Sequence, residues 1–354
     1  MRSGHATRGK DVTPFTASAF DAHEQVAFFH DQATGLRAIV AVHSTALGPG
    51  CGGVRMWPYA SDDAALEDAL KLSRAMSYKN AMAGLALGGG KAVILGDPRR
   101  DKSPALMRAF GRCVERMAGR YVTAEDVGMS VSDMQTIAQE TRFVTGTAGN
   151  AASAGDPSPY TAHGVFAGIK AALAHRFGDA AVAGRTVAVQ GLGNVGFHLA
   201  QELHAAGARL VVADIAADRV ARAVDALGAR SVGVNAILSV AADVLAPCAL
   251  GGVINDQSVE TIKAAIVAGG ANNQLAADHH GRRLMERGIL YAPDYVINAG
   301  GIMNCSLEYE GKFQSVAASM AWVESIADTL TAIFVAADRE GRPTNEIADA
   351  MARA

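Results

Sequence analysis

The sequence predicts an α/β protein of two domains, the second of them built on a doubly wound parallel sheet. The length is the first reason, because 354 residues exceed the roughly 100–200 residues of one ordinary domain. The second reason is that strand-like and helix-like segments alternate along the chain, which is typical of an α/β layer. The third is that the strand-like segments of the second half are apolar throughout, as strands buried on both faces of a parallel sheet are.

Strand and helix signals alternate in the first half from residue 24 onward. Two β-rich stretches, 24–31 and 36–44, flank a short turn with a glycine, which predicts a hairpin. The glycine-rich segment 48–59 predicts an irregular loop. From Ser61, a residue type favoured at N-caps, apolar residues recur at helical spacing, which predicts a helix that ends near Lys79. A glycine turn, a strand, a helix and another strand follow, at 88–90, 91–97, 103–119 and 121–126.

A proline-punctuated loop at 155–162 predicts a hinge near residues 147–160. Beyond it the alternation of strands and helices continues, and the tail predicts one amphipathic helix from about Ser315 to Asp338 and a short helix from Thr344. The expected first domain is 1–146, of which 1–22 form a flexible extension, and the expected second domain is 147–334. We expect the C-terminal helix, 335–354, to complete the first domain.

The charge balance and the cysteines argue against several classes of protein. The formal net charge is −3, from 32 basic and 35 acidic side chains that are interspersed, which leaves no basic surface for nucleic acid. No uninterrupted apolar run approaches the ~20 residues that span a bilayer. Four cysteines without metal-ligand spacing, and ten histidines without a metal-spaced cluster, predict reduced thiols and no metal site. We expect a cytoplasmic protein that binds neither nucleic acid nor membrane.

A glycine fingerprint follows the strand-like segment 186–190. Its order is G-x-G-x-x-G and it opens a helix, which is the arrangement of Rossmann-type dinucleotide sites. The next strand ends at Asp214, 18 residues past Gly196, where a carboxylate accepts the ribose hydroxyls of adenosine and repels a 2′-phosphate. NAD is therefore expected rather than NADP, although Arg219 nearby leaves NADP open. The expected cofactor-binding residues here are Gly191, Leu192, Gly193, Asn194, Val195, Gly196 and Asp214.

Two lysines stand in apolar surroundings in the first half. Lys91 follows three glycines, and Lys79 stands 12 positions earlier, so a glycine turn can bring both ammonium groups into one cleft. Burial and a neighbouring cation both lower the pKa of a lysine, so we expect a neutral amine that acts as a general base. Asp126 ends a strand, and ligands of α/β sheets bind at such ends.

Longer segments carry a resemblance to a known family. They are GGVRMWPYAS, EDALKLSRAMSYKNAMAGLALGGGKAVILGDP, GRYVTAEDVG, GDPSPYTA, VQGLGNVG, APCALGG, AGGANNQLA and LYAPDYVINAGGI. In this order, over about residues 24 to 340, they resemble the leucine, phenylalanine and valine dehydrogenases of the amino-acid dehydrogenase superfamily, and the leucine type most. The resemblance implies a substrate-binding and oligomerisation domain, a Rossmann-type NAD-binding domain, an active site in the cleft between them, and a homo-oligomer, either a dimer or an octamer.

The resemblance also implies roles for individual residues. Lys79, with the backbone of Gly52 and Gly53, would hold the substrate α-carboxylate. Lys91 would be the catalytic base, and Asp126 would exchange protons with the substrate amino group. Hydride transfer from the substrate Cα to the nicotinamide would leave an iminium ion, to which a water activated by the lysine adds before ammonia departs.

Further residues follow from the same resemblance. Asn273, the second asparagine of AGGANNQLA, would lie where the substrate carboxylate and the nicotinamide meet, and Thr161 would contact the cofactor. The pocket for the substrate side chain would be lined by Cys51, Ala124, Ile302 and Cys305, none of which is charged.

The pocket residues favour a branched aliphatic amino acid. Glutamate-using relatives carry a lysine at the position of Cys51, which disfavours glutamate here. Leucine-type members share the alanine at 124, whereas phenylalanine-type members tend to have glycine there. Cys51 is smaller than the residue of leucine-type members, so an aromatic preference stays open, since one methylene of pocket size is worth only about 1–3 kcal/mol.

Two other functions are weighed against an amino-acid dehydrogenase. A 2-hydroxyacid dehydrogenase needs an arginine for the carboxylate and a histidine paired with a carboxylate, and no such set is apparent in the sequence. A non-catalytic NAD sensor would keep the glycine fingerprint but need not keep Lys79, Lys91 and Asp126.

Overall fold

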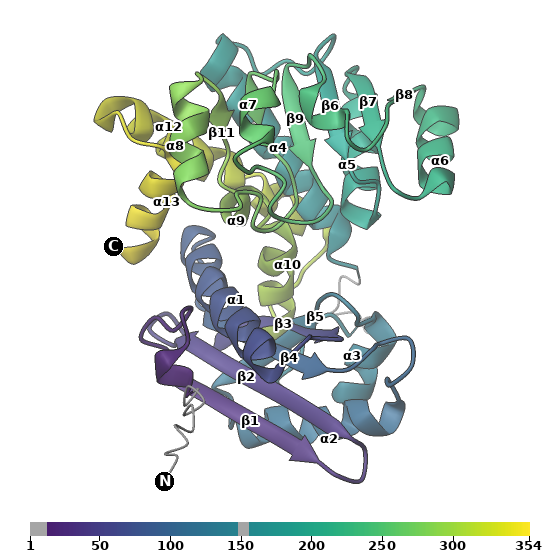
Figure 1. Ribbon diagram of the computed structural model, residues 1–354, viewed down its shortest axis with the longest axis vertical. Coiled ribbons are helices and arrows are strands. Elements are labelled where there is room, and N and C mark those ends of the chain that lie inside the picture. The colour runs from purple at the N-terminus through teal and green to yellow at the C-terminus, as the bar shows by residue number, and fades with distance from the viewer. Residues whose placement is uncertain (1–12, 148–155) are drawn as a thin grey trace, which may run out of the picture. The chain divides into compact units, whose positions relative to one another are not determined.

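The computed structural model describes residues 13–147 and 156–354, which fall into two compact units (Figure 1). The first unit takes in Met1–Ser77 and Ala86–Thr147, and the second takes in Tyr78–Leu85 and Ala148–Ala354. Residues 1–12 of the expected extension and residues 148–155 of the expected hinge lie outside the described residues.

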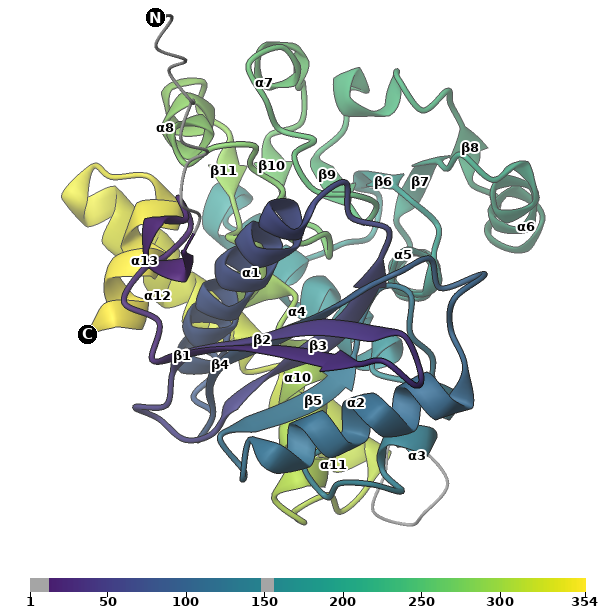
Figure 2. The same cartoon turned by 60° about the horizontal axis from the view of Figure 1, so that its bottom comes forward.

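The first unit is a five-stranded sheet covered by helices on both faces. Its strands lie in the order β1-β2-β4-β3-β5, antiparallel from β1 to β4 and parallel where β3 pairs with β4 and β5. Helix α1 packs on one face, while α2 and α3 lie on the other (Figures 1 and 2). The elements are η1 (Pro14–Thr16), β1 (Gln25–Asp31), β2 (Leu36–Ser44), β3 (Gly50–Trp57), α1 (Asp62–Met82), β4 (Gly88–Leu95), α2 (Pro104–Arg116), β5 (Tyr121–Glu125) and α3 (Val131–Ile137).

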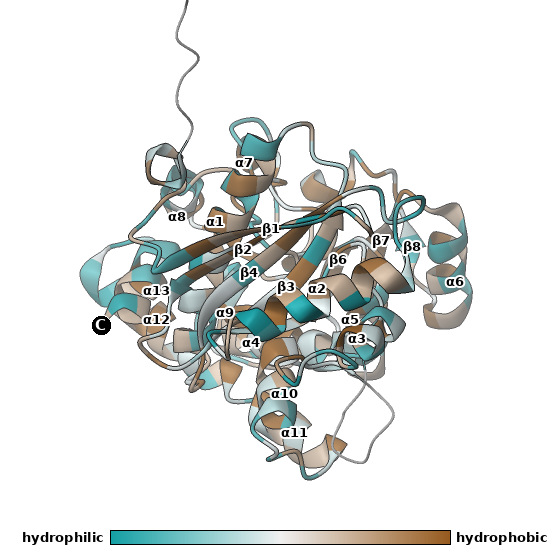
Figure 3. Ribbon diagram, turned by 90° about the horizontal axis from the view of Figure 1, so that it is seen from below, coloured by the Kyte–Doolittle hydropathy of each residue, from teal (hydrophilic) through white to brown (hydrophobic). Residues whose placement is uncertain are grey.

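Hydrophobic patterning explains these layers. β2 carries a run of buried residues from Ala38 to Val42, which Figure 3 shows as a largely brown strand. α2 alternates hydrophobic and hydrophilic residues at helical spacing, with Ser103 as its N-cap accepting a hydrogen bond from the Leu106 N–H. Its buried side faces the sheet and its polar side faces out.

The structure confirms the predicted hairpin and corrects two predictions based on glycine. Segment 48–59, expected to be a loop, contains β3, which lies between two other strands, and the expected glycine turn 88–90 begins β4. Glycine usually weakens a strand, but here it is needed for space. A Cβ on Gly52 would lie 1.9 Å from the carbonyl oxygen of Gly90. The helix expected to end near Lys79 continues to Met82.

The described part of the expected flexible extension, residues 13–22, contacts the sheet layer. The N–H and hydroxyl groups of Ser18 donate to the carboxylate of Glu67 on α1. Phe20 packs against the cluster between α1 and the sheet, and the rings of Phe15 and Phe20 meet edge to face. These contacts order a segment whose sequence shows no periodic pattern.

The second unit is a parallel, doubly wound sheet, as predicted. Its strand order is β11-β10-β9-β6-β7-β8, so the chain reverses direction across the sheet between β6 and β9. α4 and α5 contact β10, β6 and β7, whereas η2, α7 and α8 pack around a separate core cluster. The elements up to β11 are α4 (Ser158–Phe177), β6 (Thr186–Gln190), α5 (Asn194–Ala205), β7 (Arg209–Ala213), α6 (Ala217–Leu227), β8 (Arg230–Ser231), η2 (Ile237–Ser239), β9 (Val244–Pro247), α7 (Ser258–Thr261), β10 (Ile266–Val267), α8 (His279–Glu286) and β11 (Leu290–Tyr291).

The C-terminal part differs from its prediction in two ways. The elements after β11 are α9 (Asp294–Ile297), α10 (Gly300–Tyr309), α11 (Val316–Val323), α12 (Ile326–Glu340) and α13 (Thr344–Arg353). The single helix expected over 315–338 is therefore two helices. The segment 335–354, expected to complete the first domain, groups with the second unit, because α13 packs on α8, β11 and α12.

Within residues 13–147 and 156–354, one helical segment has the length and composition of a membrane span. Val316–Glu340 is long enough and its most apolar window has a mean hydropathy of 1.4, with 33% of that window buried. Core helices of globular proteins pass the same test, and α12 packs against α4. The segment is weak evidence for a membrane span.

Candidate active site

Several of the expected residues lie on one face of the sheet of the first unit. Side chains alternate between the two faces along a strand. The register pairs Cys51 with Gly89 and Gly53 with Ala124, and Lys91 stands two positions after Gly89, so these positions share a face. Lys91 also pairs with Ala41, which belongs to the core cluster that packs on α1. The face with Cys51, Ala124 and Lys91 is therefore the one that α1 covers.

Lys91 and Asp126 form an ion pair with little solvent exposure on this face. Lys91 Nζ lies 2.6 Å from Asp126 Oδ2, and the side chains are 7% and 18% exposed. Burial by itself would raise the pKa of Asp126, but the positive charges of Lys91 and Arg55 outweigh burial and lower that pKa to about 2. Asp126 is therefore a carboxylate at neutral pH, in direct contact with the expected base.

Arg55 is a member of this group that the sequence analysis did not single out. Its Nε donates to Asp126 Oδ2 at 3.0 Å, and its Nη1 donates to Asp68 Oδ2 on α1, also at 3.0 Å. A charged residue two positions after Gly53 points to the same face once 50–57 is known to be a strand. The sequence alone does not give this face, because the glycines of segment 48–59 predict a loop instead of a strand.

Gly52 and Gly53 lie where other backbone atoms come close. A Cβ on Gly53 would lie 2.6 Å from the carbonyl oxygen of Glu125 and 2.7 Å from the Cβ of Asp126. The same face can therefore hold the Asp126 side chain over β3 only because position 53 has no side chain. The Tyr121 hydroxyl donates to the Gly52 carbonyl at 2.6 Å, which fixes this part of the backbone from the opposite face.

The glycine fingerprint of the second unit forms the turn between β6 and α5. Gly191 has φ of +92°, a conformation that favours glycine, and a Cβ on Gly196 would lie 2.0 Å from the Gly191 carbonyl oxygen. A Cβ on Gly193, in contrast, would meet nothing within 4 Å. The backbone at Gly193 therefore borders open space at the N-terminus of α5, where helix N–H groups and the helix dipole favour an anion.

Asp214 lies at the carboxyl end of β7, next to the fingerprint. Its Oδ2 accepts a hydrogen bond from the Leu192 N–H at 2.6 Å, and its Oδ1 accepts one from the Ala216 N–H at 2.8 Å. Arg219 Nη1 lies 3.8 Å from the same carboxylate. The open backbone, the helix N-terminus and this carboxylate stand where the strand order reverses, and together they fit a dinucleotide.

Lys79 and the asparagine segment contact each other within the second unit. Lys79 Nζ donates to the side-chain oxygen of Asn272 at 3.2 Å, and Asn298 Nδ2 donates to that oxygen at 2.7 Å. The neighbouring Asn273, which the sequence singled out, has a left-handed backbone with φ of 52°, and its carbonyl accepts from the Gly252 N–H. Asn272 is thus a polar residue that the motif did not distinguish from Asn273, and Asn298 is one that the sequence did not single out.

Lys79 also contributes to the charge around Asp294. Burial raises the pKa of Asp294, while the Gln274 N–H and the charge of Lys79 partly oppose that effect. The Gln274 N–H donates to Asp294 Oδ2 at 2.7 Å. The buried carboxyl group of Asp294 therefore holds the backbone at Gln274, the residue directly after the two asparagines.

The four expected pocket residues divide between the units. Cys51 and Ala124 are buried on the first unit's sheet, while Ile302 and Cys305 lie on α10 of the second unit, partly buried and buried respectively. Thr161 on α4 lies beside α10, because a Cβ on Gly301 would stand 2.6 Å from the Thr161 hydroxyl oxygen.

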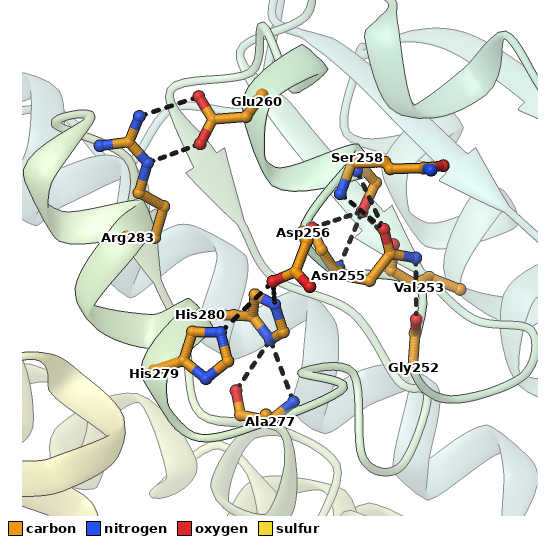
Figure 4. A network of polar contacts seen from close by, with 11 residues as sticks. Gly252, Val253, Asn255, Asp256, Ser258, Glu260, Ala277, His279, His280 and Arg283 are labelled. Atoms are coloured by element: carbon orange, nitrogen blue, oxygen red, sulfur yellow. Dashed lines mark hydrogen bonds and ion pairs between the residues drawn. The ribbon is translucent and has the colours of Figure 1, made fainter.

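In the part of the chain that the structure describes, one group of side chains is close enough to share a metal ion (Figure 4). It consists of Asp256, His279 and His280, whose ligand atoms lie within 4.8 Å of one another. Hydrogen bonds account for the buried histidine. His280 Nδ1 lies 3.0 Å from both the backbone nitrogen and the carbonyl oxygen of Ala277, and its Nε2 lies 2.9 Å from Asp256 Oδ1. The other two side chains are exposed, at 86% for Asp256 and 68% for His279.

A buried lysine–aspartate pair in one unit and a dinucleotide fingerprint in the other are the features of a dehydrogenase. Two family models agree with that class. The model described as "Glu/Leu/Phe/Val dehydrogenase, dimerisation domain" matches residues 23–143, and the one described as "Glutamate/Leucine/Phenylalanine/Valine dehydrogenase" matches 156–218 and 216–345. The chain belongs to this family of amino-acid dehydrogenases, as its motifs predicted, and the family implies a nicotinamide cofactor.

Individual relatives are similar over nearly the whole chain. A leucine dehydrogenase from Geobacillus stearothermophilus is 53% identical over 330 residues, covering 93% of this chain and 89% of the relative. A valine dehydrogenase from Streptomyces albus is 48% identical, covering 93% and 91%. Among solved structures, L-tryptophan dehydrogenase from Nostoc punctiforme is 44% identical with a TM-score of 0.78, covering 94% of this chain and 95% of that one.

Proposed function

We propose that this protein is an NAD-dependent L-amino-acid dehydrogenase that converts a branched aliphatic amino acid reversibly to its 2-oxo acid, ammonia and NADH. The observation that carries the proposal is the Lys91–Asp126 pair, 2.6 Å apart, in a chain whose relatives include leucine and valine dehydrogenases at about 50% identity. A dinucleotide-binding domain alone would not define a reaction, whereas this pair supplies a base and a carboxylate for proton transfer.

The proposed roles follow from charge and position. Lys79 and the backbone of Gly52 and Gly53 hold the α-carboxylate of the substrate. Asp126 takes a proton from the substrate ammonium group, which makes the nitrogen lone pair available. Bound NAD supplies a hydride acceptor for the substrate Cα. Lys91, as the neutral amine, then takes a proton from the water that adds to the resulting iminium carbon, and Asp126 returns its proton to nitrogen. As the C–N bond breaks and ammonia leaves, the hydroxyl proton passes to the freed Asp126 carboxylate.

Since one substrate molecule must meet the base and the hydride acceptor, both units are needed for the reaction. In this proposal residues 1–146 form the substrate domain and residues 147–334 the NAD domain. Asn273 and Thr161 lie on the second domain and are proposed to orient the nicotinamide and the substrate carboxylate. The polar contact of Lys79 with Asn272 adds that asparagine as a candidate for the same task.

NAD is the proposed cofactor because of Asp214. Its carboxylate is bonded to the fingerprint backbone at Leu192 and is only 5% exposed, so a 2′-phosphate nearby would meet a fixed negative charge. Arg219, 3.8 Å away, reduces that repulsion without removing it. The nicotinamide cofactor then binds through Gly191, Leu192, Gly193, Asn194, Val195 and Gly196.

The branched aliphatic substrate is proposed from the uncharged lining. Cys51 and Ala124 offer a small apolar wall, and Ile302 and Cys305 add a second apolar surface from α10. An aromatic amino acid is the second candidate, favoured by the small Cys51 side chain and by the similarity to a tryptophan dehydrogenase.

We further propose a cytoplasmic homo-oligomer. The first unit matches the dimerisation domain of the family, which supports an oligomer. All four cysteines are thiols rather than disulfides, as expected of a protein in a reducing compartment.

A substrate panel tests the proposal. Purified protein is mixed with NAD or NADP and one of the L-amino acids leucine, isoleucine, valine, phenylalanine, tryptophan or glutamate, and the absorbance of the reduced cofactor is followed. We expect the largest kcat/KM with NAD and a branched aliphatic substrate. A larger value with phenylalanine or tryptophan would correct the substrate, and turnover of none of the six would refute the function.

A further inference from the structure

Arg55 connects the two carboxylates on the α1-covered face of the first unit's sheet. Its side chain is 21% exposed, with Nε bonded to Asp126 and Nη1 bonded to Asp68. The nitrogens of a guanidinium group are held in one plane, so fixing one of them orients the others. Asp68, on α1, thereby determines the direction from which Arg55 approaches Asp126. The Tyr59 hydroxyl donates to the same oxygen of Asp68 at 2.6 Å and restrains that carboxylate in turn.

Arg55 and Lys91 converge on a single oxygen. Asp126 Oδ2 accepts from Lys91 Nζ at 2.6 Å and from Arg55 Nε at 3.0 Å. The two nitrogens are therefore within about 6 Å of each other, a range in which a like charge disfavours protonation. A guanidinium group keeps its charge at every pH at which the protein is folded. Asp126 thus has one neighbour whose charge is permanent and one whose charge can change.

A second carboxylate and two phenols also lie around this pair. Asp68 is the second carboxylate and is bonded to Arg55. Burial raises the pKa of Tyr59 and of Tyr121, which keeps both phenols neutral. The cluster is therefore two cations against two carboxylates when Lys91 is protonated.

We infer that Arg55 is a positioning residue for the proposed reaction: it holds the Asp126 carboxylate at Lys91 and supplies the fixed positive charge that favours the neutral lysine. The inference rests on the proposed function, because it concerns the work of Lys91 and Asp126. When Asp126 takes the proton of the substrate amino group, its negative charge is lost. Lys91 has then lost its own carboxylate partner, while Arg55 keeps Asp68, so the neutral amine that can accept a proton from water is favoured.

The test is Arg55→Met, with Arg37→Met as the matched control. Arg37 also joins a strand to an aspartate of α1, since its Nη2 lies 2.6 Å from Asp62 Oδ1, but this pair is more than half exposed and distant in sequence from Lys91 and Asp126. For Arg55→Met we expect kcat to fall by about 10²-fold, the loss typical of a misplaced catalytic group. The rise of kcat/KM with pH should move up by about one pH unit. KM for NAD should stay within about twofold, and Arg37→Met should match the wild type.

Arg55→Lys separates charge from geometry. It keeps the positive charge but cannot bridge two carboxylates as the planar guanidinium does. We expect its pH profile to match the wild type while kcat stays at least about tenfold lower. This variant also carries the test if Arg55→Met does not fold, as judged by circular dichroism and NAD binding.

The outcomes separate the two proposals. If the wild type turns over an amino acid, the role of Arg55 is overturned by either of two results. One is an unchanged kcat and pH profile in folded Arg55→Met, and the other is an unchanged kcat in Arg55→Lys. Both leave the proposed function intact. A wild-type protein that turns over no amino acid overturns both.

Discussion

Gly52 and Gly89 in the first unit and Gly193 in the second have opposite surroundings. In the first unit, Gly52 and Gly89 lie inside strands, where a Cβ would stand 1.9 Å from the Gly90 carbonyl oxygen and 2.0 Å from the Ser77 hydroxyl oxygen. In the second unit, the backbone of Gly193 borders open space in a turn. Glycine in the first unit permits the fold, whereas Gly193 leaves room for a ligand. A glycine count or motif does not separate these roles, but substitutions do.

The largest expected effect is on folding, from Gly52→Ala. The added methyl group meets the Gly90 carbonyl of β4, and β4 is held between β2 and β3, so the clash cannot be relieved by rotating a side chain. We expect a loss of more than about 4 kcal/mol in unfolding free energy, at the extreme of single substitutions. Urea unfolding followed by circular dichroism measures it. Wild-type stability in this variant would refute the crowded geometry of β3.

A large effect on activity is expected from Lys91→Ala. Removing a general base usually costs about 10²–10⁴-fold in rate. The dinucleotide fingerprint lies in the other unit, so NAD affinity should be unchanged when measured by titration calorimetry. Activity at the wild-type level would reject Lys91 as the base, and a parallel loss of NAD binding would show that the two units are not functionally separate.

Asp126 should make stability depend on pH at the acidic end. Its pKa is lowered from 3.8 to about 2 in the folded state, so its contribution is complete above pH 4 and is lost as pH falls through 2. Linkage gives a loss of about 2 kcal/mol over that window. We expect Asp126→Asn to lose correspondingly less unfolding free energy between pH 5 and pH 2 than the wild type. Equal losses in urea titrations at the two pH values would contradict the depressed pKa.

A moderate effect is expected from Gly193→Ala in the open turn. Nothing lies within 4 Å of the added Cβ, so the fold and melting temperature should be retained. The methyl group would occupy the space in which the backbone approaches the pyrophosphate, and we expect KM for NAD to rise about tenfold, or about 1.4 kcal/mol. An unchanged KM would remove Gly193 from the proposed site. The contrast with Gly52→Ala tests the two uses of glycine directly.

An effect of about the same size as that of Gly193→Ala is expected from Ala124→Gly in the substrate pocket. Removing one methyl group deepens the proposed pocket, which should shift the ratio of kcat/KM for phenylalanine over leucine upward by about tenfold. Ala124 is buried on β5, and Ala92 on β4 is also buried, so Ala92→Gly is a matched control for the loss of a methyl group from this sheet. A ratio that does not move in Ala124→Gly would show that this alanine is not in the pocket wall.

Most of the fold could be predicted because its signals are local. The hairpin β1–β2, helix α2 and the alternating elements of the second unit depend on patterns that repeat every two or three to four residues. The errors fall where distant segments decide the outcome. The glycines of β3 predict a loop when the sequence is taken alone. They are present because β4, which is distant in the chain, packs closely against them. The helix expected at 315–338 is interrupted between Val323 and Ile326.

The candidate site shows the same division. Lys91, Asp126, Asp214 and the fingerprint glycines could be named from motifs, and the structure gives Lys91 and Asp126 a direct contact. Arg55 and Asn272 could not be named, because nothing in their sequence neighbourhood distinguishes them until their partners are known. A hydrogen bond between residues 71 or 193 positions apart leaves no periodic trace in one sequence.

The sequence by itself determined the α/β class, the doubly wound sheet and the family, because hydrophobic period, turn residues and motif order are written along the chain. Only the tertiary structure decided that two cations converge on one oxygen of Asp126, that Gly52 and Gly193 have opposite surroundings, and that Lys79 meets Asn272. The physical reason is that electrostatic and steric interactions act over a few ångströms of space. Which residues come within that range is set by the packing of strands and helices, irrespective of their separation in the chain.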